Sequence, residues 1–110
     1  MSTLGIVSRN PETNEMRGSI ALLGRRNPVG IEIVPNPAKA HERQPDFRIF
    51  SGTNELGAGW VKTSRETGKA YISLRIFHPQ IAQWPIYANL GRAAGQDDDD
   101  VLAVIVNEAV

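Results

Sequence analysis

The chain is 110 residues long, of which 41% are hydrophobic and 22% are charged, values that are typical of a single folded domain and argue against wholesale disorder. It has no cysteine, which excludes disulfides, thiolate catalysis and cysteine-based zinc sites and fits a reducing compartment. It also shows no secretory signal and no apolar run long enough for a membrane helix, so we expect one soluble, cytoplasmic domain over residues 1–110.

The net charge of zero hides two regions of opposite sign. Residues 1–92 hold all twelve Lys and Arg but only seven Asp and Glu, a net charge of +5, whereas residues 93–110 hold five acidic residues and no basic one. The sequence therefore predicts a mildly basic body and an acidic C-terminal segment, residues 97–110, that ends in a buried strand.

Eight short segments have the alternation or the apolar run of a β-strand, and turn-forming residues separate them. They are residues 3–8, 16–23, 29–34, 47–50, 56–62, 69–76, 86–90 and 101–106. The polar stretch 38–44 between two of them is too short for a stable helix, so we expect a loop there. This pattern predicts an all-β, mainly antiparallel domain with little helix, either a small barrel or a sandwich.

The clearest local pattern is a hairpin over residues 56–76. Its second strand alternates polar residues with four apolar ones, Ala70, Ile72, Leu74 and Ile76. Gly68 suits the turn because glycine tolerates positive φ, and Gly57 and Gly59 predict a bulge or the close approach of another strand. The expected core comprises Phe47, Ile49, Trp60, Ile72, Leu74, Ile76 and Val104.

Residues that could catalyse a reaction or bind a metal form no known pattern. His41 and His78 are far apart and have no metal-ligand spacing, so we expect neither a metal nor another cofactor. Ser64 and Ser73 have no histidine base nearby in the sequence, and no glycine-containing stretch carries the lysine of a phosphate loop. We therefore expect that the protein is not an enzyme.

The aspartate run Asp97–Asp100 has three interpretations. It could bind a divalent cation, although the glycine and carbonyl ligands of a calcium loop are missing. It could screen a basic face of the protein as a nucleic-acid mimic. The third interpretation, which we favour, is that its charges protect the apolar run 101–106 from aggregation.

The polar side of the predicted hairpin alternates positive charge with an aromatic ring. Surfaces that bind single-stranded nucleic acids combine these groups, because rings stack on bases and cations bind phosphates. The pattern predicts a site for single-stranded DNA or RNA that comprises Arg48, Lys62, Arg65, Lys69, Tyr71 and Arg75, with Arg43 as a further contributor. An ordinary solvated face of a sheet is the simpler alternative.

A second candidate surface would bind a protein partner. It is either an exposed edge strand or the segment after the hairpin, in which Trp84, Ile86 and Tyr87 are candidate partner-binding residues.

Three stretches also carry a family resemblance: PDFRIF at 45–50, ELGAGWVKTSRETGKAYISLRI at 55–76 and PIYANL at 85–90. In this order they resemble the bacterial family catalogued as domain of unknown function 736. Residues 77–81 depart from the family, because FHPQI stands where members usually have an acidic pair and a proline-rich bend. The resemblance therefore assigns no catalytic residue.

Members of that family are typically carried on plasmids and other conjugative elements. The resemblance implies an accessory role on a mobile genetic element. We expect a non-catalytic protein-interaction module, with single-stranded nucleic-acid binding by the hairpin as the alternative.

Overall fold

The computed structural model describes residues 3–22, 24, 26–81, 84–93, 95 and 98–106. Within these residues it contains eight strands and no helix. The strands are β1 (Thr3–Arg9), β2 (Met16–Ile20), β3 (Val29–Pro35), β4 (Phe47–Ser51), β5 (Asn54–Thr63), β6 (Ala70–Ile76), β7 (Ile86–Arg92) and β8 (Val101–Val106).

All eight predicted strands are present; β8 has the predicted bounds, and the other seven differ from the prediction by one to three residues at one or both ends. The largest difference is in β2, which ends at Ile20 instead of continuing to residue 23, a residue outside the described part. Residues 38–44 form turns and no helix, as predicted. No helix in the described part of the chain is long and apolar enough to cross a membrane.

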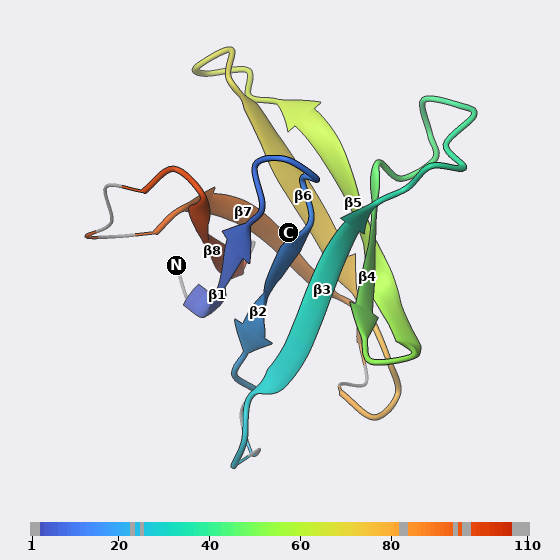
Figure 1. Ribbon diagram of the computed structural model, residues 1–110, viewed down its shortest axis with the longest axis vertical. Helices are drawn as coiled ribbons and strands as arrows, with labels where there is room; N and C mark the ends of the chain where they lie inside the picture. The colour runs from blue at the N-terminus through green and yellow to red at the C-terminus, as the bar shows by residue number, and fades with distance from the viewer. Residues whose placement is uncertain are drawn as a thin grey trace.

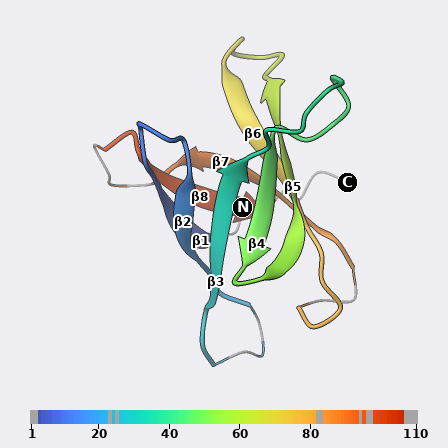
Figure 2. The ribbon, with the colours of Figure 1, turned by 45° about the vertical axis from the view of Figure 1, so that its right-hand side comes forward.

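Each strand pairs antiparallel with the next, and β1 also pairs with β8, so the sheet closes into a barrel (Figures 1 and 2). The all-β prediction is confirmed, and the structure is a barrel rather than a sandwich. Because a closed barrel has no free strand edge, the predicted interaction through an exposed edge strand is wrong for this sheet.

Alternate residues of each strand point into the barrel and form the core. Five of the seven predicted core side chains are at most 4% exposed: Phe47, Ile49, Leu74, Ile76 and Val104. Ile72 is partly buried and packs against this cluster. Adjacent residues of β8, Ala103 and Val104, are both buried, whereas the other four residues are partly buried, so the predicted burial on both faces is found only at the centre of this strand.

Trp60 is the core prediction that is wrong. The register between β4 and β5 shifts beside Leu56, because Ile49 pairs with Gly57 whereas Phe50 pairs with Glu55. This bulge adds one residue to β5, so Leu56 is buried while Trp60 lies on the outer face opposite Ser73.

The two glycines of β5 mark the bulge and a close approach between strands, as predicted. A Cβ atom at Gly57 would lie 1.8 Å from the carbonyl oxygen of Arg75, so only glycine fits this backbone position. Gly59 faces the core, where a Cβ atom would crowd the side chains of Leu74 and Phe47. The glycines therefore make room for core side chains from the neighbouring strands.

The hairpin of β5 and β6 extends beyond the body of the barrel (Figures 1 and 2). Ser64 closes its turn by donating a backbone hydrogen bond to the carbonyl of Lys69 and accepting one from Gly68, whose φ is +71°. The predicted positive φ at Gly68 is confirmed, and Lys69 belongs to the turn rather than to β6.

Candidate nucleic-acid interface

Three neighbouring strands, β5, β6 and β7, present a shared outer face that is rich in aromatic and basic residues. The pairing register aligns outward residues in rows across these strands: Arg75 beside Tyr87, then Trp60 beside Ser73 and Asn89, then Lys62 beside Tyr71. We call the five aromatic and basic members, Trp60, Lys62, Tyr71, Arg75 and Tyr87, the aromatic-basic face.

The aromatic-basic face is hollowed in two places. One open hollow of about 380 Å³ lies between Trp60, Arg75 and Tyr87, and the side chain of Arg43 also lines it. A second, of about 660 Å³, lies between Lys62, Arg65 and Tyr71 at the base of the hairpin turn. Lys62 lines both hollows, so they adjoin along the strands.

Five basic residues outside this face are held in ion pairs, whereas the cations at the face, like Arg26 and Lys69 elsewhere, take part in none among the described residues. Ion pairs within the described residues join Arg9 to Asp100, Arg17 to Glu32, Lys39 to Asp46, Arg48 to Glu55 and Arg92 to Asp99. Lys62, Arg65 and Arg75 make no ion pair with any described residue. One carboxylate, that of Glu66, lies at the rim beside Arg65. The face therefore keeps uncompensated positive charge.

Hydrogen bonds to β5 hold the loop between β3 and β4 against the edge of this face. The indole Nε1 of Trp60 donates a hydrogen bond of 3.1 Å to the carbonyl oxygen of Arg43. The backbone N–H of Val61 donates one of 2.8 Å to the carboxylate of Asp46, which also pairs with the Lys39 ammonium at 2.6 Å. These contacts fix the edge of the indole and hold Arg43 against the hollow.

The carboxylate of Asp46 makes this attachment of the loop sensitive to low pH. The hydrogen bond from Lys39, followed by that from the Val61 N–H, lowers the pKa of Asp46 below its ordinary value of 3.8. A lowered folded-state pKa stabilises the fold fully above pH 3.8, and this stabilisation disappears as the pH falls through the folded-state pKa.

We therefore expect Asp46→Asn to destabilise the protein at neutral pH by at most about 1 kcal/mol, because the pair is partly exposed. The difference from wild type should shrink as the pH falls below about 3.8. Urea unfolding at several pH values checks this, with Glu12→Gln in the exposed β1–β2 turn as the control. A difference in the free energy of unfolding that stays constant down to about pH 3 would contradict the lowered pKa of Asp46.

Arg48 does not join the aromatic-basic face as a free cation. Its guanidinium makes two hydrogen bonds, of 2.8 and 3.1 Å, to the carboxylate of Glu55, and it lies 5.0 Å from the ring centre of Phe50. The paired charges raise the pKa of Arg48 and lower that of Glu55. The predicted binding role of Arg48 stays a prediction, and this pairing weakens it because the charge of Arg48 is already compensated.

The other predicted residues divide between the face and its surroundings. Arg65 lines the second hollow, whereas Lys69 is exposed in the turn and lines neither. Trp84 is 76% exposed, as a docking residue would be, whereas Ile86 is only partly exposed and packs against the core, so its partner-binding role stays a prediction. Tyr87, 53% exposed, belongs to the aromatic-basic face.

The described aspartates of the acidic segment contact other arginines. The carboxylate of Asp100 binds Arg9 at 2.9 Å, and that of Asp99 lies 3.9 Å from Arg92. Asp98 accepts a hydrogen bond from the backbone N–H of Asp100, and Asp97 lies outside the described residues. Asp99 and Asp100 therefore do not screen the cations of the aromatic-basic face. No group of three possible metal ligands occurs among the described residues.

Sequence reasoning missed two members of the aromatic-basic face, Trp60 and Tyr87, and the two polar residues of its middle row, Ser73 and Asn89. Trp60 was expected inside the barrel, and Ser73 and Asn89 were assigned no binding role. The alternation of β6 and β7 could have placed Ser73 and Asn89 outside, but their position beside Trp60 depends on the register between strands.

A comparison with protein families identifies the chain. The model of the family described as "Protein of unknown function (DUF736)" matches residues 3–108. The chain belongs to this family. No curated protein and no solved structure matches this DUF736 member significantly.

Proposed function

We propose that the aromatic-basic face binds single-stranded nucleic acid, DNA or RNA, without catalysing a reaction on it. The observation that carries this proposal is that cations without an acidic partner among the described residues share one face of the sheet with the exposed ring of Tyr87 and the partly exposed rings of Trp60 and Tyr71. A strand of nucleic acid complements both features, because its phosphates are negative and its unpaired bases have exposed π faces.

The spacing of the face supports a short binding site. Tyr87 and Tyr71 lie two rows apart, and each row advances by two residues, so the face spans roughly 13 Å along the strands. Sheets of this kind stack about two or three bases on their rings. The hydroxyl of Ser73 and the amide of Asn89 lie in the middle row, where they could hydrogen-bond to the edge of a base.

Binding should depend on salt because Lys62, Arg65 and Arg75 would displace counterions from phosphates. Contacts to three phosphates give a slope of about −2 in a plot of log affinity against log salt concentration, so a fourfold rise in salt weakens binding by roughly sixteenfold. Fluorescence anisotropy with a labelled oligothymidylate at several salt concentrations tests this. The absence of binding at low salt would refute the proposal, and salt-independent binding would refute its electrostatic basis.

We also propose that the protein works in the cytoplasm as an accessory factor of a mobile genetic element. The absence of cysteine supports a reducing compartment, and the family resemblance supports the element. The non-catalytic role is supported by Ser64, whose hydroxyl accepts hydrogen bonds from the backbone N–H groups of Glu66 and Thr67 within the turn.

Trp84 favours a second candidate function, the binding of a protein partner. A tryptophan that is 76% exposed is typical of an interface anchor rather than of a solvated surface. A partner bound through Trp84 should dissociate from Trp84→Ser, whereas nucleic-acid binding through the aromatic-basic face should persist in this variant. Loss of nucleic-acid binding in Trp84→Ser would show that the two surfaces are not separate.

A further inference from the structure

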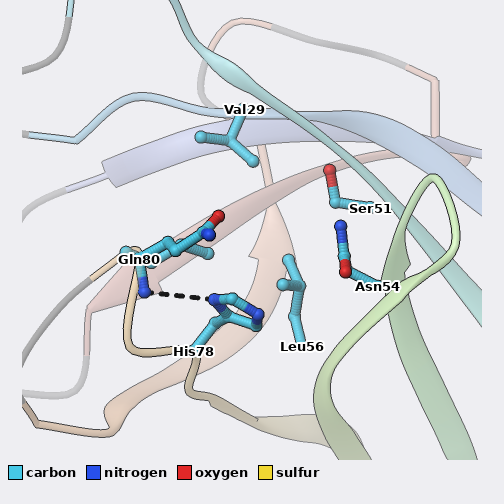
Figure 3. A pocket seen from close by; sticks show the side chains of 7 residues that line it. Val29, Ser51, Asn54, Leu56, His78 and Gln80 are labelled. Carbon is cyan, nitrogen blue, oxygen red and sulfur yellow. Dashed lines mark hydrogen bonds between the residues drawn. The ribbon is translucent and has the colours of Figure 1, made fainter.

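A small pocket lies at the end of the barrel where β3 begins and the β4–β5 and β6–β7 connections meet. Its volume is about 150 Å³, and the side chains that line it surround a common space (Figure 3). Val29, Leu56 and Ile81 supply apolar walls, and the polar groups come from Ser51, Asn54, His78 and Gln80. None of these residues belongs to the aromatic-basic face.

The segment that carries His78 is held in place by hydrogen bonds. The backbone N–H of Phe77 donates to the carbonyl of Leu56 at 2.6 Å, and that of Ile81 donates to the carbonyl of His78 at 2.9 Å. The backbone N–H of Gln80 donates to Nδ1 of His78 at 3.1 Å (Figure 3). Because Nδ1 accepts this bond, a neutral His78 carries its proton on Nε2 and can donate it to a ligand.

The polar groups of the pocket define the ligand. The Ser51 hydroxyl and the Asn54 amide make no side-chain hydrogen bond with any described residue, so both are available as donors and acceptors. Among the described residues, no Lys, Arg, Asp or Glu lines the pocket, so these residues offer a charged ligand no opposite charge. A cavity of this size accepts a single ring of about six to nine non-hydrogen atoms.

We infer that this pocket binds an uncharged planar heterocycle the size of a pyrimidine base, with hydrogen-bond donors and acceptors on its edge. The apolar walls would cover the faces of the ring, and Asn54, Ser51 and His78 would bind its edge. The same ring is available from two sources, a free base and a base of a nucleic-acid strand. The inference does not depend on the proposed function of the aromatic-basic face.

Methyl-detected NMR of the wild-type protein tests this inference with uracil as the probe and benzene as an apolar ring of similar size. We expect uracil to shift the methyl signals of Val29, Leu56 and Ile81 in the millimolar range and benzene to bind at least fivefold more weakly. Asn54→Ala should weaken uracil binding at least fivefold, and Val29→Phe should abolish it by filling the pocket.

Three results would overturn the inference: no shift of these methyl signals with uracil, benzene binding as tightly as uracil, or unchanged uracil binding in a folded Asn54→Ala variant. A titration with oligouridylate separates the two sources. Shifts at the pocket with both probes assign it to a base of a strand, and shifts with uracil alone assign it to a free base. Shifts with oligouridylate alone would also contradict the inference, because the ring itself must bind.

Discussion

Phe47→Ala is expected to lower the free energy of unfolding by about 3–5 kcal/mol, because it removes a large side chain from a closely packed core. Phe47 is 4% exposed and lies at the start of β4, where its pairing partner Gly59 leaves room for the ring. Trp60→Ala should cost only about 1–2 kcal/mol, although tryptophan is larger, because Trp60 lies half-buried on the outer face and loses partial burial and one hydrogen bond.

Urea unfolding followed by circular dichroism compares these variants without relying on tryptophan fluorescence. Val61→Ala is the control for a partly exposed side chain of the same strand, since Val61 is 50% exposed and should contribute under about 1 kcal/mol. If Trp60→Ala were as costly as Phe47→Ala, Trp60 would be a core residue and the aromatic-basic face would lose its central ring.

The largest expected effect on binding follows reversal of two charges on the aromatic-basic face. Lys62→Glu combined with Arg75→Glu replaces two cations without acidic partners by two carboxylates, which would repel phosphates. We expect at least a hundredfold loss of affinity for single-stranded DNA and a smaller salt dependence of any binding that remains.

A matched control separates local charge from net charge. Arg17→Glu combined with Arg26→Glu changes the net charge equally, but Arg17 lies on β2, across the barrel from β6, and Arg26 lies in the exposed connection after β2. This control should alter affinity by less than about threefold at physiological salt, because screening limits distant charges. Equal losses in both double variants would contradict a localised site.

Much of the fold could be predicted because strand alternation is a local property. The second hairpin strand shows it clearly, and the apolar run of β8 correctly indicates a strand whose centre is buried. Closure of the barrel could not be predicted in this way. It depends on pairing between β1 and β8, which are almost the whole chain apart, and no local pattern distinguishes a barrel from a sandwich.

Trp60 shows why alternation along a strand does not always predict which side a residue faces. A bulge reverses the side to which every later residue of a strand points, and Gly57 and Gly59 indicated a bulge without fixing its position. The extra residue, Leu56, therefore reversed the predicted orientation of the strand beyond it.

The candidate site was predicted in part for the same reason. Tyr71 and Arg75 share a face because of alternation within β6 alone, so they could be assigned from the sequence, whereas the place of Lys62 beside Tyr71 depends on the register between β5 and β6. The ion pair of Arg48 with Glu55 could not be predicted from the sequence, because it depends on the register of two strands across a bulge. The place of Tyr87 beside Arg75 could not be predicted either, because it depends on the register between β6 and β7.

The most direct test of nucleic-acid binding uses Trp60 as its own reporter. The chain has two tryptophans, so Trp84→Phe leaves Trp60 as the only one. Titration of this variant with oligothymidylate at low salt should quench the fluorescence of Trp60, because a base stacks on the indole, and added salt should reverse the quenching. Unchanged Trp60 fluorescence, whether or not the oligonucleotide binds, would contradict binding at the aromatic-basic face.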